Sequence, residues 1–76
     1  MEETLLFLAR RLVSRPDEVS VVRSERDDAV LFELRVAPDD VGRVIGKGGR
    51  TVRSLRVLVR ASGAKSGERR LLEIVG

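Results

Sequence analysis

The chain has 76 residues, which allows one small domain and excludes a doubly wound nucleotide-binding fold or a TIM barrel. It contains no Cys and no His, so disulfides, Cys/His zinc sites, thiol nucleophiles and histidine bases are all excluded. The net charge of +3 conceals an asymmetry, because residues 1–40 hold six Arg against ten acids, whereas residues 41–67 hold seven bases and no acid. Such a basic stretch favours a polyanionic partner, although a solvated helix face that lacks acids explains it equally.

No segment suits a membrane. The longest uncharged apolar run, residues 4–9, is far below the roughly 20 residues of a membrane-spanning helix. The acidic opening Met1-Glu2-Glu3 is unlike a signal peptide, which begins with positive charge. We therefore expect a soluble, cytoplasmic protein with no membrane partner, no cofactor and no metal.

The first half of the chain reads as one helix and two strands. Apolar residues recur at helical spacing over residues 2–14, and Pro16 ends this segment. Residues 19–24 and 29–36 read as strands, the second with clear alternation of apolar and polar side chains. Residues 25–28 join them as a hairpin connection, because Asp tolerates turn geometry.

The second half begins at Pro38, where a proline followed by Asp39 and Asp40 is typical of a helix start. It continues as a short helix, a glycine-rich break, a long helix, a loop and a last strand (residues 41–45, 46–49, 50–62, 63–67 and 70–75). The resulting order α-β-β-α-α-β predicts the α+β class, with a three-stranded sheet packed against helices in a single domain over residues 1–76.

The segment that carries the chemistry runs from Val44 to Val52 and reads as helix, glycine-rich turn, helix. Glycines allow positive φ and close approach of a ligand, and the second helix begins with free N–H groups, so the turn is a natural phosphate seat. A plain helix–helix corner is the alternative. A P-loop is excluded by the spacing and by Gly48 after Lys47, and a dinucleotide GxGxxG is excluded by Thr51.

The fuller pattern Val-Ile-Gly-x-x-Gly-x-x-Val between two helices resembles the KH domain signature. The element order resembles the prokaryotic type II KH arrangement over essentially the whole chain. More narrowly, the run Arg35–Asp40 before Val44–Lys47 resembles the small bacterial KhpA-type RNA-binding proteins. Gly48 departs from the polar or charged residue that is common there, which shifts phosphate contacts onto Lys47, Arg50 and backbone N–H groups.

The resemblance implies a non-catalytic protein that clamps about four nucleotides of single-stranded RNA, with the GXXG loop Gly46–Gly49 on the phosphate backbone. It also implies an aliphatic base groove that uses Val44, Ile45 and Val52 on the helix side and strand 29–36 on the other. An RNA chaperone acting as a homodimer, or as a heterodimer with a larger KH-containing protein, is implied as well. The expected RNA-binding residues are Val44, Ile45, Gly46, Lys47, Gly48, Gly49, Arg50, Val52 and Arg53.

Three further readings bear on this interpretation. Base stacking on aromatics is not expected, because Phe7 and Phe32, the only aromatics, sit in apolar patterns typical of core positions.

The paired acids Asp27-Asp28 and Asp39-Asp40 serve the hairpin and the helix start, so we expect no catalysis. A helix-turn-helix bound to DNA is the structural alternative, against which the short first helix and the three glycines argue.

The long helix carries two features on its surface. Arg53, Arg56 and Arg60 cluster away from its apolar face, and either a nucleic-acid backbone or solvent suits them. Ser54, Val57 and Ala61 lie together off the core face, with Leu58 at the border. These small and apolar residues predict a twofold dimer through this helix, which makes a protein-interaction module on a KH scaffold the alternative function.

Overall fold

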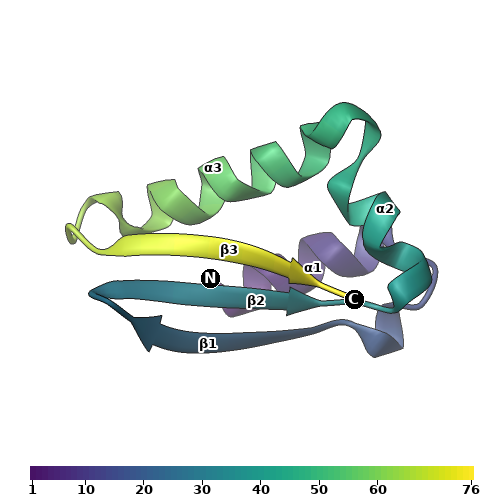
Figure 1. Cartoon of the computed structure of the whole chain (residues 1–76), viewed down its shortest axis with the longest axis horizontal. Helices are drawn as coiled ribbons and strands as arrows, with labels where there is room; N and C mark the ends of the chain where they lie inside the picture. Colours follow the sequence, from purple (N-terminus) through teal and green to yellow (C-terminus); the bar gives the residue numbers. More distant parts are fainter.

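The computed structural model describes residues 1–76 and contains three helices and three strands in the order α-β-β-α-α-β (Figure 1). The α+β class and the type II KH order are therefore confirmed. The elements are α1 (Glu2–Leu12), β1 (Ser20–Arg26), β2 (Ala29–Arg35), α2 (Val41–Ile45), α3 (Arg50–Ala64) and β3 (Arg69–Val75). Three single-turn 3₁₀ segments, η1 (Pro16–Glu18), η2 (Pro38–Asp40) and η3 (Lys47–Gly49), join them.

The sheet has the order β1-β2-β3, with β2 antiparallel to β1 and parallel to β3. Asp27 and Asp28 form the two-residue turn of the β1–β2 hairpin, at φ values of 48° and 64°. Positive φ at both positions gives a type I′ turn, in which Asp is one of the favoured residues. The predicted hairpin is confirmed, and β1 runs two residues beyond its predicted end because pairing continues as far as this turn.

All three helices cover one face of the sheet. The alternate β2 residues Val30, Phe32 and Leu34 point into the core, where they meet Leu5 of α1 and Val59 of α3. Figure 1 shows α3 running along β3 and α1 crossing behind the sheet. The opposite face carries no helix, and there Leu71 and Val22 are exposed.

One aromatic differs from its prediction. Phe32 is buried as expected, but Phe7 is 60% exposed. Phe7 lies 200° around α1 from the buried Leu5 at 100° per residue, so it points away from the sheet. The guanidinium of Arg11 lies 5.4 Å from the centre of its ring.

Two helix ends also differ from the predicted ones. Helix α1 ends at Leu12, because the N–H groups of Ser14 and Arg15 donate to the Asp40 carboxylate instead of continuing the helix. Helix α3 includes Gly63, which the sequence placed in the loop. A Cβ at Gly63 would overlap the Glu68 carbonyl oxygen, so glycine lets the chain fold back closely into β3.

The helices are short and amphipathic. None combines the length and the apolar character that crossing a lipid bilayer requires.

Candidate nucleic-acid interface

The glycine loop between α2 and α3 has an open backbone conformation. Gly46, Gly48 and Gly49 adopt φ values of 77°, 64° and 76°, which L-residues rarely adopt. The loop is closed by a hydrogen bond from the Gly49 N–H to the Gly46 carbonyl, at 3.0 Å. A Cβ at Gly48 or Gly49 would meet nothing within 4 Å, so the outer side of the loop is free for a ligand.

Gly46 is required for a different reason. A Cβ at this position would overlap the side chain of Thr51, in the first turn of α3. Thr51 therefore packs directly against the loop and sets its angle to α3. The sequence pattern did not predict this role for Thr51. The only trace of the contact in the sequence is Gly46, the residue against which Thr51 packs.

The loop opens onto the N-terminus of α3. Gly49 is the N-cap residue, and no side chain caps this helix end. The first N–H groups of a helix have no intrahelical carbonyl partner, and with the helix dipole they favour an anion at this point. A phosphate group seated on the loop would face these groups together with the exposed side chains of Lys47 and Arg50.

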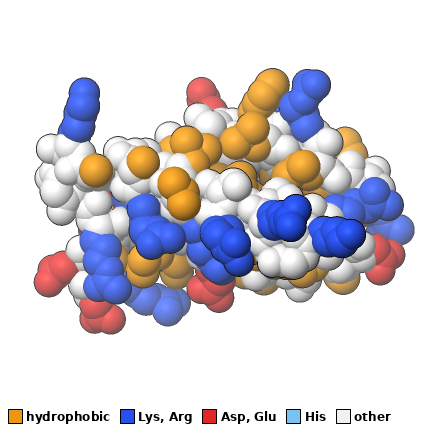
Figure 2. Space-filling view, turned by 90° about the horizontal axis from the view of Figure 1, so that it is seen from above, with side chains coloured by type: hydrophobic (Ala, Val, Ile, Leu, Met, Phe, Trp, Pro, Cys, Tyr) orange, Lys and Arg blue, Asp and Glu red, His pale blue; other side chains and the backbone are white.

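The cations beside the loop carry no neutralising partner. All of the ion pairs in the molecule involve other basic groups, at the N-terminus or on Arg15, Arg23, Arg35, Arg43 and Arg70. The basic row, defined as Lys47, Arg50, Arg53, Arg56 and Arg60, is exposed and free of carboxylates. Figure 2 looks onto α3 and shows basic side chains in a row across this face, with acidic side chains only near its margins.

The structure brings the predicted phosphate-contact residues together but corrects two predicted groove residues. Val44 is completely buried in the hydrophobic core, and Val52 is only 7% exposed. Neither can offer a surface to a base, because the α2–α3 corner turns both side chains toward the sheet. Ile45 is half-buried and remains accessible beside the loop.

The strand that borders α3 is also not the predicted one. Strand β2 is central in the sheet and is flanked by β1 and β3. Strand β3 is the edge strand next to α3, and the Arg56 Nε on α3 donates to the Leu72 carbonyl on β3 at 3.4 Å. The groove beside the basic row therefore lies between α3 and β3, where Arg56, Arg60, Arg70, Leu71 and Leu72 enclose about 290 Å³.

Asp40 has a role that differs from the predicted one. It is the N-cap residue of α2, but its side chain makes no capping bond. Instead the fully buried carboxylate accepts hydrogen bonds from the Ser14 N–H at 3.0 Å, the Ser14 hydroxyl at 2.8 Å and the Arg15 N–H at 3.1 Å. It thereby ties the end of α1 to the start of α2, the helix that leads into the loop.

The electrostatics of Asp40 follow from these bonds. The Ser14 N–H is the largest cause that holds the pKa of Asp40 below its ordinary value, against burial, which raises it. The Ser14 hydroxyl, the Arg15 N–H and Arg43, whose Nε lies 3.3 Å from Oδ1, lower the pKa further. Asp40 is thus ionised at neutral pH, and its carboxylate is engaged in bonds that hold the fold.

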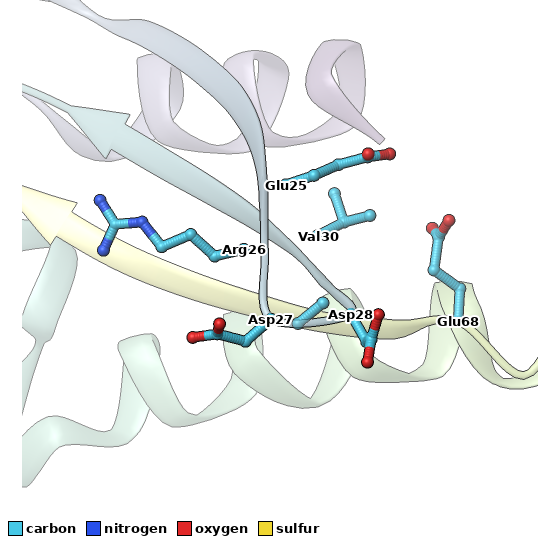
Figure 3. A pocket seen from close by; sticks show the side chains of 7 residues that line it. Glu25, Arg26, Asp27, Asp28, Val30 and Glu68 are labelled. Carbon is cyan, nitrogen blue, oxygen red and sulfur yellow. The ribbon is translucent and has the colours of Figure 1, made fainter.

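Another hollow lies at the hairpin, beside the loop that joins α3 to β3. Figure 3 shows Glu25, Asp27, Asp28 and Glu68 around it, with Arg26 as its one base. These carboxylates do not converge as metal ligands. Their negative charge repels a polyanion, so the acidic hairpin end is a poor candidate for the same partner as the basic row.

The chain is similar to known proteins over nearly its whole length. Residues 2–74 match the family model described as KhpA/KhpB, KH domain. A protein of Treponema pallidum named RNA-binding protein KhpA is 49% identical over 74 residues, which cover 97% of this chain and 92% of that protein. Proteins of the same name are 39% identical in Clostridium acetobutylicum and 40% identical in Caldanaerobacter subterraneus, each over 99% of this chain and 100% of the relative.

Proposed function

The chain belongs to the KhpA/KhpB family of KH domains, and from this premise we propose that it binds single-stranded RNA without catalysing a reaction. The observation that carries the proposal is the basic row, which begins at an open glycine loop and has no carboxylate partner. Exposed cations without carboxylate partners repel one another, which slightly destabilises the folded chain. An anionic ligand that binds this face would relieve the repulsion, and it best explains why the cations are concentrated there.

The loop binds one phosphate through backbone N–H groups and the side chains of Lys47 and Arg50. Arg53, one turn further along α3, contacts the next part of the backbone. The bases then lie in the groove between α3 and β3. Single strands suit this site better than duplex DNA, because α2, with only five residues, is short for the first helix of a helix-turn-helix, and three glycines with positive φ break the chain between α2 and α3.

A titration across salt concentrations tests the proposal. We expect fluorescein-labelled single-stranded RNA to bind more tightly than a DNA duplex of the same sequence, with the affinity for RNA falling as salt rises. Equal affinity for the two nucleic acids at every salt concentration would indicate general charge attraction and contradict the proposed groove.

A second property, self-association through α3, has its own support. Val57 is 57% exposed and Leu58 is 37% exposed on α3, next to the small residues Ser54 and Ala61. A largely apolar groove of about 380 Å³ adjoins them between α1 and α3, lined by Leu8, Arg11, Leu12, Thr51, Ser54, Leu55 and Leu58. We propose that a second copy of the chain covers this surface, with the two α3 helices in contact across a twofold axis.

This dimer is compatible with RNA binding. Arg56 and Arg60 lie on the β3 side of α3, whereas Ser54 and Leu58 lie on its α1 side. A dimer through the α1 side therefore leaves the groove between α3 and β3 open in each protomer. Sedimentation of the chain without RNA tests it, and a monomer at tens of micromolar contradicts it.

A further inference from the structure

The far end of the groove between α3 and β3 has features that phosphate binding at the loop does not use. Arg56 and Arg60 are one turn apart on α3, and both face the edge strand β3. Together with Arg70, Leu71 and Leu72 they enclose a hollow of about 290 Å³, which is roomy enough for a nucleobase. None of these five residues is among those expected to bind RNA from the sequence motif.

Arg56 lies beside this hollow. Its Nε is 3.4 Å from the Leu72 carbonyl, a long hydrogen bond that orients the guanidinium toward β3 and leaves its two Nη groups without a protein partner. A guanidinium presents N–H donors in a planar fork that fits two neighbouring acceptors. Arg56 is therefore an oriented donor pair beside a hollow, whereas Arg60 is free to follow a ligand.

The surroundings of the hollow leave two guanidinium groups free for a ligand. Arg70 is already neutralised, because its Nε bonds the Glu68 carboxylate at 2.6 Å and its Nη1 bonds the Ser62 hydroxyl at 2.9 Å. Leu71 and Leu72 of β3 complete the lining, with Leu72 only 7% exposed. The free groups in the hollow are therefore the guanidinium groups of Arg56 and Arg60, which are planar and can stack on a base or bond its edge.

The distance from the loop fits the end of a short bound strand. From Arg50 to Arg60 the helix advances about 15 Å, at about 1.5 Å per residue. The basic row thus extends well beyond the loop along α3, and a KH domain clamps about four nucleotides. A strand seated on the loop and running along α3 therefore brings its last bound nucleotide to Arg56 and Arg60.

We propose that this hollow is a base subsite that selects guanine at the nucleotide farthest from the GXXG loop. Guanine presents O6 and N7 as two adjacent acceptors, which match the free Nη groups of Arg56. Adenine, cytosine and uracil present no such pair of acceptors on one Hoogsteen edge. The subsite rests on the proposed function, because it is the continuation of the strand that the loop holds.

The test uses fluorescein-labelled hexauridylates in which one uridine is replaced in turn by guanosine, adenosine or cytidine at each position. We expect guanosine at one terminal position of the footprint to tighten binding by about tenfold over the other bases. R56K keeps the charge but loses the fork, so the ratio of its affinities for the guanosine oligomer and for the other oligomers should fall from about ten to about one, whatever the change in its overall affinity. R53A, the control, should weaken all oligomers and keep the preference.

The outcomes separate this subsite from the proposed function. A preference for guanosine that survives in R56K overturns the subsite. Equal binding of all bases, weakened equally by R56A, also overturns it and makes Arg56 a phosphate contact, while RNA binding itself stands. If the native chain binds none of the oligomers, or binds them unchanged after the loop is made acidic, the proposed function fails and the subsite fails with it.

Discussion

Replacing Lys47 and Gly48 with Asp should remove most RNA binding and leave the fold intact. Gly48 has a φ of 64°, the same value that Asp28 adopts in the hairpin of this chain, and a Cβ there meets nothing within 4 Å. Lys47 is exposed and has no ion pair. The double variant therefore changes the charge of the loop by three units with little strain.

The loss of affinity follows from Coulomb's law. A unit charge about 6 Å from a phosphate in water contributes about 0.7 kcal/mol, so three units weaken binding by about 2 kcal/mol at low salt. That is a change of about 30-fold in Kd. Screening over about 8 Å at 0.15 M salt reduces the energy by about half, which leaves about fivefold.

The matched control replaces the same two residues with Asn. Asn has the shape of Asp and tolerates positive φ, but the loop then loses only one unit of charge, so Kd should rise by about threefold at low salt. Fluorescence polarisation with a single-stranded RNA measures both variants, and circular dichroism checks the fold. Equal affinities for the Asp and Asn variants, with unchanged dichroism, would refute the assignment of a phosphate to this loop.

Three other changes test the rest of the reasoning. R50A or R53A should each lower the log–log salt slope of RNA binding by about 0.7, whereas R26Q, at the acidic hairpin end, should leave it unchanged. D40N should lower Tm at neutral pH, because the amide cannot accept all three N–H and O–H groups of Ser14 and Arg15. The folded pKa of Asp40 lies below its unfolded pKa, so the stability that the carboxylate adds is fully present above the unfolded pKa and is lost as the pH falls through the folded pKa. The variant should therefore lose less stability than the native chain as acid is added. A61F, on the exposed side of α3, should give folded monomers by sedimentation, and a Phe variant that still forms dimers would place the interface elsewhere.

The order of the elements and the position of the loop could be predicted because their signals are local. Alternation over residues 29–36 marks a strand, and three glycines between two apolar helical segments mark a turn. Phe7 shows the limit of such patterns. We predicted Phe7 to be in the core because it is an apolar residue in an apolar helix. The sheet covers the opposite side of this helix, where Leu5 lies, so Phe7 remains exposed.

The walls of the groove could not be predicted, because they depend on the order of strands in the sheet. The pattern of residues 29–36 shows a half-buried strand but not whether it lies at an edge. The parallel pairing of β2 with β3 puts β2 at the centre, so β3 becomes the strand beside α3. Val44 and Val52 were misplaced for the same reason, since the direction of the α2–α3 corner relative to the sheet decides which valines are covered.

Asp40 was assigned to the nearest helix, although its partners lie 25 and 26 residues earlier in the chain. No local pattern reports such a contact. Its consequence for function is that α2 is attached at its start to the end of α1, so the loop that follows α2 has a fixed support.

The distribution of charge gives the bound strand one available path. The basic row begins at the loop and ends near Arg60, and beyond it the hairpin end presents Asp27 and Asp28 without ion-pair partners, beside Glu25 and Glu68, which pair with Arg23 and Arg70. A single strand seated on the loop gains attraction along α3 and meets repulsion where the acids begin. The footprint should therefore end at the Arg56–Arg60 turn, so that the charges of this one domain determine the length of RNA it holds.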